Sequence, residues 1–180
     1  ILKEGPDTIA GFFAEPVMGA GGVIPPSKGY FEIVQKILKK YDIPFIADEV
    51  ICGFGRTGNL WGSQTYNIQP DILIASKCIT SGFFPLGAVI LGEKMTQEMM
   101  EASYKAEEFF HGFTAGGHPV GCALALEAID IIINEKMIDY PIRHLKSFCS
   151  SQTIKETRSL FFIFVVCSDR FESRTIGQIS

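Results

Sequence analysis

Short, largely apolar runs recur along the first half of the chain, and glycine, proline or a charged residue bounds each of them. The four runs are residues 9–14, 43–47, 71–75 and 85–91. Apolar runs of this length without a polar alternation are typical of strands that are buried on both faces of a parallel sheet. The pattern therefore predicts a mainly parallel sheet.

Helical spacing fills the intervals between and after these runs. The first apolar stripe advances in steps of 3, 4 and 3 residues through Phe31, Val34, Leu38 and Tyr41. Ser27 is the predicted N-cap of this helix. Two more helices are expected, a polar-faced one at 95–105 and one rich in small residues at 119–135. Strand, helix and strand in this order form a right-handed βαβ unit, so the expected fold class is α/β.

Composition narrows the class of partner. The chain has 180 residues, of which 47% are hydrophobic, as expected for a globular protein. Its net charge of −4 gives no reason to expect nucleic acid as a partner, and no membrane partner is expected either. No apolar run reaches the ~18 residues that a membrane-spanning helix needs. The five cysteines show no CxxC pair, which predicts buried, reduced thiols. The three histidines lack the spacing of metal ligands, so no metal site is predicted.

Two ionisable residues follow two of the predicted strands directly. Asp48 closes the run 43–47, and Lys77 follows the run 71–75 after a single serine. Ligands of open α/β sheets lie just outside the carboxyl ends of the strands, so both side chains are expected at one ligand-binding edge. Pyridoxal phosphate is a cofactor that needs such a pair, because a lysine forms its Schiff base and an aspartate faces its pyridine nitrogen.

Four motifs, in this order along the chain, carry a resemblance to one known protein family. They are EPVMGAGGVIPP (15–26), ADEVICGFGRTG (47–58), SKCITSGFFPLGA (76–88) and HGFTAGGHPVGCALAL (111–126). The segment from about residue 5 to residue 138 resembles the class III pyridoxal-phosphate aminotransferases. The resemblance implies part of a three-layer, fold-type I large domain, and a homodimeric parent with shared sites.

The resemblance assigns roles to individual residues. Lys77 is expected to hold the cofactor and carry protons, with burial lowering its pKa. Asp48 is expected to face the pyridine nitrogen, and Val50, two residues on, to point to the same side and pack on the ring. Thr114 is expected to reach the phosphate of the neighbouring subunit's cofactor. Each residue also has an ordinary structural alternative: Lys77 as a surface lysine, Asp48 as a turn cap, Val50 as a core valine and Thr114 as a turn hydroxyl.

Three further residues concern the substrates. Glu15 corresponds to the family acid that pairs with an arginine and so switches the site between partners. Phe84 is a candidate wall of the substrate pocket, with core packing as the alternative. Ile51 stands where some family members have a glutamine, and this favours the branch that uses pyruvate or glyoxylate as amino acceptor.

The expected function is transfer of an amino group from an ω-amino acid, an amine or alanine to a keto acid. The alternatives are other class III chemistry (aminomutase, decarboxylase or racemase) and a catalytically inactive truncated product. Residues 1–140 are expected to be the C-terminal part of the cofactor-binding domain, and residues 141–180 a tail that does not match the family. The chain begins at Ile1 rather than Met and is expected to come from a longer intracellular protein, mitochondrial or cytoplasmic.

Overall fold

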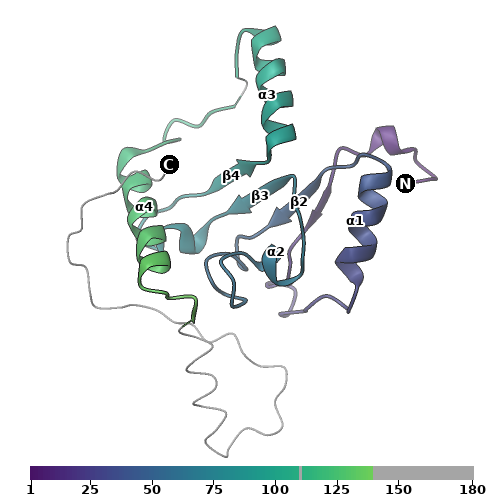
Figure 1. Cartoon of the computed structure of the whole chain (residues 1–180). Helices are drawn as coiled ribbons and strands as arrows, with labels where there is room; N and C mark the ends of the chain where they lie inside the picture. The colour runs from purple at the N-terminus through teal and green to yellow at the C-terminus, as the bar shows by residue number, and fades with distance from the viewer. Residues whose placement is uncertain (110, 140–180) are drawn as a thin grey trace, which may run out of the picture.

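Four short strands form one sheet in the order β1-β2-β3-β4 (Figure 1). The computed structural model describes residues 1–109 and 111–139. The elements in chain order are η1 (Pro6–Thr8), β1 (Phe12–Ala14), α1 (Tyr30–Lys40), β2 (Phe45–Asp48), α2 (Gly62–Thr65), β3 (Ile72–Ala75), η2 (Lys77–Thr80), β4 (Ala88–Leu91), α3 (Glu93–Ala106) and α4 (Pro119–Asn134).

The sheet is mainly parallel, as the sequence predicts. β1 pairs in parallel with β2, and β2 in parallel with β3, with Asp48 opposite Ile74. β4 is the exception, because it runs antiparallel to β3 with Ala75 opposite Ala88. The carboxyl ends of β1, β2 and β3 therefore lie at the same edge of the sheet, and α3, which follows β4, begins at the opposite edge.

One face of the sheet carries the core. Phe45 and Ala47 alternate inward on β2 and are buried, and Phe31 and Leu38 of α1 form one core cluster with Phe45. The ring of Phe12 on β1 meets that of Phe45 edge to face, with 5.3 Å between centroids. A second cluster at the other end joins β3, η2 and α4 through Ala75, Ile79 and Ala125.

The opposite face of the sheet is open, and here the prediction of strands buried on both faces is wrong. Phe13 on β1 is 57% exposed and Val89 on β4 is 63% exposed. The apolar runs do contain residues for both faces, but the helices that the structure describes cover only one. This open face also carries Asp48, because side chains on a strand alternate and Asp48 shares the side of Ile46.

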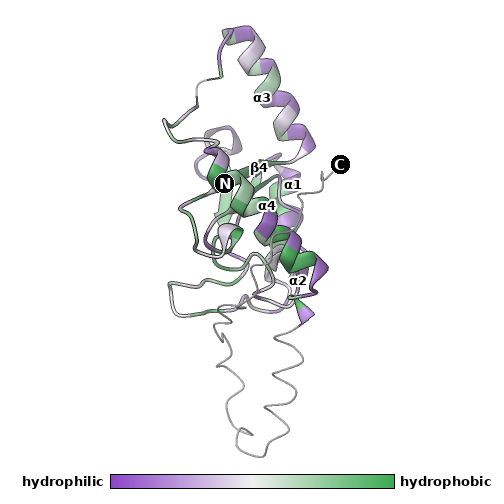
Figure 2. Ribbon diagram, turned by 90° about the vertical axis from the view of Figure 1, so that its left-hand side faces the viewer, coloured by the Kyte–Doolittle hydropathy of each residue, from purple (hydrophilic) through white to green (hydrophobic). Residues whose placement is uncertain are grey.

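The three predicted helices are confirmed, with small changes at their ends. α1 begins at Tyr30 after Gly29, so the prediction of Ser27 as its N-cap is wrong. α3 has no buried residue, and Figure 2 shows mostly hydrophilic colouring where it projects from the sheet. Among the described residues, no helix is both long and apolar enough to span a bilayer.

Candidate active site

Asp48 is the last residue of β2, where the strand meets the ligand-binding edge of the sheet. Its side chain is half-buried, and its Oδ1 accepts a hydrogen bond from the backbone N–H of Val50 at 3.0 Å. The bond fixes the first turn after the strand and is the turn-capping role named above as an alternative. It occupies one carboxylate oxygen and is compatible with a second partner, because a carboxylate has about four lone-pair sites.

Lys77 is the first residue of η2, two positions after the end of β3. Its backbone adopts a left-handed conformation with φ of 46°, which is uncommon for any residue other than glycine. The turn is held by Thr80 Oγ1, which donates to the carbonyl of Phe84 at 2.6 Å, and by Ser76 Oγ, which donates to the carbonyl of Leu86 at 3.0 Å. Lys77 itself is exposed, so the expected burial of the lysine is not found in this chain.

The structure brings Asp48 and Lys77 to one edge, as predicted. Their strands are hydrogen-bonded neighbours, and Lys77 lies three positions after Ile74, the registered partner of Asp48. The pairing continues one residue further, since the N–H of Glu49 donates to the carbonyl of Ile74 at 2.9 Å. An accessible amine and a half-buried carboxylate on adjacent strand ends fit a cofactor that is attached through an amine and carries a protonated ring nitrogen.

Val50 does not follow the strand periodicity by which its direction was predicted. β2 ends at Asp48, and Val50 lies in the turn after it, half-buried. A two-residue step aligns side chains only inside a strand, so that argument does not apply here. The contact of Val50 with a cofactor ring stays a prediction.

Glu15 follows β1 directly and so reaches the same edge as Asp48 and Lys77. Its Oε2 accepts the backbone N–H of Gly19 at 2.8 Å. Gly19 packs closely here, because a Cβ on it would lie 2.5 Å from Cδ1 of Ile51. The acid is thus built into the loop after β1, while its predicted exchange between an arginine and a substrate stays a prediction.

Phe84 is half-buried and packs against α4. Its ring lies 5.1 Å from that of His118, and a Cβ added to Gly121 would lie 2.8 Å from two of its ring atoms. This supports the core-packing alternative for Phe84 without testing its role in a substrate pocket. The contact also explains, within one chain, why a residue as small as Gly121 stands in α4.

Thr114 lies in an exposed turn between α3 and α4. No hydrogen bond of the described residues joins it to Asp48 or Lys77. Its predicted contact with a cofactor in a neighbouring subunit stays a prediction.

Sequence reasoning missed Glu49, which is completely buried. Both carboxylate oxygens accept backbone N–H groups at the start of α2: Oε2 from Gly62 at 2.8 Å and Oε1 from Ser63 at 2.6 Å. The only signal in the sequence is its place directly after Asp48 and before a glycine-rich loop.

The loop after β2 is also tied to the lysine turn. Arg56 Nη2 donates to Sγ of Cys78, the residue after Lys77, at 3.5 Å. The rings of Phe54 and Trp61 pack 4.9 Å apart beside the same turn. The ends of β2 and β3 are therefore joined by side chains as well as by the sheet.

Cys52 is completely buried, three residues after Glu49. Its Sγ donates to the carbonyl of Val17 at 3.3 Å. Burial raises the pKa of this thiol from its ordinary value of 9.0 to about 11, and the charges of Glu49, Glu15 and Asp48 add to the shift. Among the described cysteines only Cys52 is buried; Cys78 is half-buried and Cys122 exposed, so the prediction of buried thiols is correct for only one of these three.

This raised pKa predicts a loss of stability in alkali. Above the ordinary pKa of 9.0 the thiol of the unfolded chain ionises, while in the folded chain it stays protonated up to about pH 11. In the unsubstituted chain we expect the free energy of unfolding to decrease as the pH rises from 9.0 to about 11. In Cys52→Ala the contribution of this thiol to the decrease should be absent. Urea unfolding at several pH values measures it, with Cys122→Ala as the control; equal pH dependence in the two variants would contradict the assignment.

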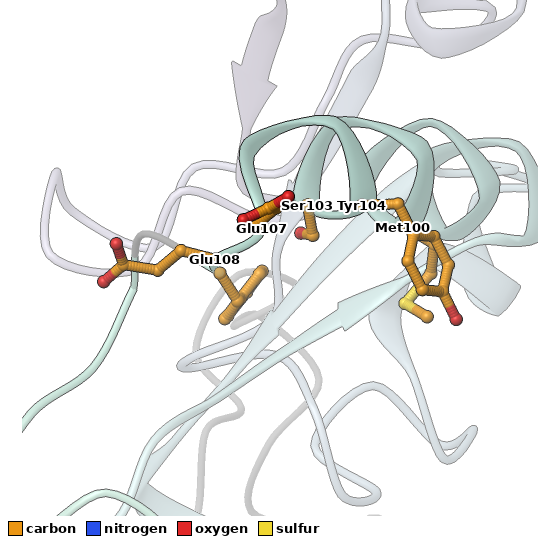
Figure 3. A pocket seen from close by; sticks show the side chains of 6 residues that line it. Met100, Ser103, Tyr104, Glu107 and Glu108 are labelled. Atoms are coloured by element: carbon orange, nitrogen blue, oxygen red, sulfur yellow. The ribbon is translucent and has the colours of Figure 1, made fainter.

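A hollow of about 370 Å³ lies away from this edge. It is formed at the C-terminal end of α3 by Met100, Ser103, Tyr104, Glu107, Glu108 and Phe109 (Figure 3). β4 runs antiparallel to β3, so α3 begins at the edge of the sheet opposite to Asp48 and Lys77. The hollow is therefore not part of the site at those two residues. Within the described residues, no cluster of histidine, cysteine and carboxylate side chains is arranged to hold a metal ion.

Comparisons with known proteins agree with the family resemblance of the sequence. Residues 1–157 match the sequence model of the family Aminotransferase class-III. The chain is 53% identical over 165 residues to "Gamma aminobutyrate transaminase 3, chloroplastic" of Solanum lycopersicum, covering 88% of this chain and 32% of that protein. It is 51% identical over 170 residues to "Gamma aminobutyrate transaminase 1, mitochondrial" of the same plant, covering 91% of this chain and 33% of that protein.

Solved structures give the same answer for the fold. An ω-aminotransferase from Paracoccus denitrificans superposes with a TM-score of 0.79 at 57% identity, over 89% of this chain and 37% of that one. A PLP-bound aminotransferase mutant from Vibrio fluvialis superposes with a TM-score of 0.78 at 58% identity, over 83% and 35%. The fold-type I expectation is confirmed for this part of the domain. The predicted boundary at residue 140 stays a prediction, since residues 140–180 lie outside the described part.

The chain spans about a third of the length of the curated relatives that it matches. Within that third lie the ends of β2 and β3, with Asp48 and Lys77, to which the resemblance assigns the cofactor. The match of residues 1–157, together with identities near 50%, shows that this chain belongs to the class III aminotransferase family.

Proposed function

We propose that this chain supplies the lysine-bearing part of the cofactor site of a pyridoxal-phosphate-dependent transaminase. The observation that carries the proposal is the placement of Asp48 and Lys77 at the ends of two neighbouring parallel strands. Family membership supports it, and solved relatives include forms described as PLP-bound and PMP-bound.

Each of the two residues has a defined task in this reaction. When bound, pyridoxal phosphate supplies an electron sink for the carbon that carries the amino group. Lys77 would hold the cofactor covalently through Nζ and, once released, move the proton at the substrate carbon. The Asp48 carboxylate would keep the ring nitrogen protonated. Val50 is proposed to pack on the ring.

The substrates follow from the relatives and from the site loop. Relatives named gamma-aminobutyrate transaminases support an ω-amino acid such as 4-aminobutyrate as donor, with an amine or alanine in the same class. The side chain of Ile51 cannot donate a hydrogen bond, which supports pyruvate or glyoxylate as acceptor. Glu15 and Phe84 are proposed to contact the substrate side of the site.

The assembly and the compartment are proposals of the same kind. The exposed position of Thr114 is compatible with a homodimer in which this hydroxyl reaches the partner's cofactor. The relatives carry mitochondrial and chloroplastic names, which supports an organelle, and the sequence favours a mitochondrial or cytoplasmic location.

A hybrid enzyme tests the proposed function. In it, residues 1–139 of this chain replace the matching segment of the tomato gamma aminobutyrate transaminase 3. We expect the hybrid to bind pyridoxal phosphate and to convert 4-aminobutyrate only when pyruvate or glyoxylate is present. Turnover that continues without a keto acid would contradict transamination and favour a racemase or decarboxylase reaction.

The 180-residue chain alone serves as the comparison. The chain spans about a third of the length of its curated relatives, so we expect the isolated chain to bind the cofactor weakly or not at all. A hybrid that neither binds the cofactor nor turns over, although it is folded, would instead support the catalytically inactive alternative.

A further inference from the structure

Glu49 has a fully buried carboxyl side chain that the proposed chemistry does not use. Its side chain is 0% exposed, and its two oxygens accept the N–H groups of Gly62 and Ser63 at 2.8 and 2.6 Å. A buried carboxylate is costly unless it is hydrogen-bonded, so this pair of bonds explains why the charge is tolerated. It does not explain why the residue directly after Asp48 has this arrangement.

The backbone of Glu49 is bonded on both sides as well. Its N–H donates to the carbonyl of Ile74 at 2.9 Å, and its carbonyl accepts the N–H of Gly53 at 2.8 Å. One residue thus joins three segments: the end of β3, the turn that follows β2, and the start of α2. Asp48, the last residue of β2, directly precedes Glu49.

Close packing around Gly62 keeps the carboxylate bond short. A Cβ on Gly62 would lie 2.7 Å from Cβ of Cys52 and 2.9 Å from Cβ of Pro16. Both of those atoms belong to short or rigid side chains, so a larger residue would push the start of α2 away from Glu49. The loop is shaped to bring its amides to this acid.

We propose that Glu49 is a positioning residue that fixes the direction of the Asp48 carboxylate. Asp48 ends β2 on the open face, and the peptide that links it to Glu49 donates its N–H to the carbonyl of Ile74, so anchoring Glu49 holds the backbone from which the Asp48 side chain projects. A rotation of the backbone that moved one side chain would move the other. The inference rests on the proposed function, in which Asp48 faces the ring nitrogen of pyridoxal phosphate.

Glu49→Gln in the hybrid enzyme tests this role. Glutamine has nearly the same size, but its amide nitrogen faces an N–H donor, so one of the two bonds is lost. We expect the affinity for pyridoxal phosphate to fall by about tenfold, which is a coupling of the size usual between two linked sites. kcat should fall as well, while KM for 4-aminobutyrate stays within about twofold, because only the orientation of Asp48 is disturbed.

Asp71→Ala is the matched control. Asp71 Oδ2 accepts the N–H of Phe45 at 2.8 Å, which is a carboxylate–backbone bond at the opposite end of the same strand. Alanine removes this bond completely, so we expect the unfolding midpoint to fall in both variants, but the cofactor affinity to stay unchanged in Asp71→Ala. Equal cofactor affinities in the two variants would overturn the inference and leave Glu49 a stabilising residue only.

A measurement on the unsubstituted hybrid covers the case in which Glu49→Gln does not fold. If Glu49 couples to the cofactor through Asp48, binding must tighten the Glu49 bonds by the same free energy. Amide hydrogen exchange at Gly62 and Ser63 should therefore slow by about tenfold when pyridoxal phosphate binds, and exchange at Phe45 should not. Unchanged exchange at Gly62 and Ser63 overturns the inference; a hybrid that does not attach the cofactor at Lys77 overturns the proposed function beneath it.

Discussion

Lys77→Ala in the hybrid enzyme is expected to lower turnover by at least about 10⁴-fold. The same amine serves as covalent anchor and as proton carrier, and general acid–base catalysis alone contributes roughly 10²–10⁴-fold. The position supports both tasks, because Lys77 is exposed at the end of β3 beside the strand that carries Asp48. Borohydride reduction with pyridoxal phosphate should label a single peptide, the one containing Lys77, and Lys77→Ala should lose that label.

Lys94→Ala is the control for this result. Lys94 is a lysine of the same chain, but its Nζ pairs with Asp42 Oδ1 at 2.7 Å, and that bond raises its pKa. A protonated amine is a poor nucleophile, so we expect no label there and nearly full turnover in the variant. Label found on Lys28, Lys94 or Lys105 in place of Lys77 would overturn the site assignment.

Asp48→Asn is expected to lower kcat by about 10²–10³-fold while leaving the fold intact. Removing one preorganised electrostatic partner of a reacting group typically has an effect of this size. Asparagine retains an oxygen that can accept the Val50 N–H, so the turn after β2 keeps its hydrogen bond. Only the negative charge toward the ring nitrogen is lost, which separates this substitution from a folding defect.

Thermal unfolding and steady-state kinetics together decide the Asp48 prediction. The unfolding midpoint of Asp48→Asn should match that of the unsubstituted hybrid within about 2 °C, since the size and the local bond are retained. A variant with normal kcat would show that Asp48 only caps the turn after β2, through its hydrogen bond with Val50.

The strands and helices were predictable because their signals are local. Bare apolar runs end at Asp48 and Ala75 in the structure as in the sequence, and α4 begins at Pro119 as expected. Strand β1 is shorter than the run 9–14, because a 3-10 turn occupies Pro6–Thr8 and pairing with β2 begins only at Phe12. Local patterns also placed Asp48 and Lys77 at one edge, since parallel strands share their carboxyl ends.

What the sequence did not reveal depends on contacts between distant segments. Burial of Glu49 requires the amides of Gly62 and Ser63, which lie 13 and 14 positions away. Exposure of Phe13 depends on which elements cover its face, and no run of residues encodes that. The direction of Val50 was wrongly argued because strand β2 stops two residues before it.

The left-handed backbone of Lys77 has an evolutionary consequence. A residue with a Cβ costs roughly 1–2 kcal/mol in this conformation, whereas glycine adopts it freely. Lys77→Gly should therefore give a chain that folds more stably than Lys77→Ala, although both lack the amine. In a lineage released from selection for catalysis, drift at this codon toward glycine would carry a folding advantage. A lysine at this position therefore costs stability that a glycine would not, at the residue to which the proposed function assigns the cofactor.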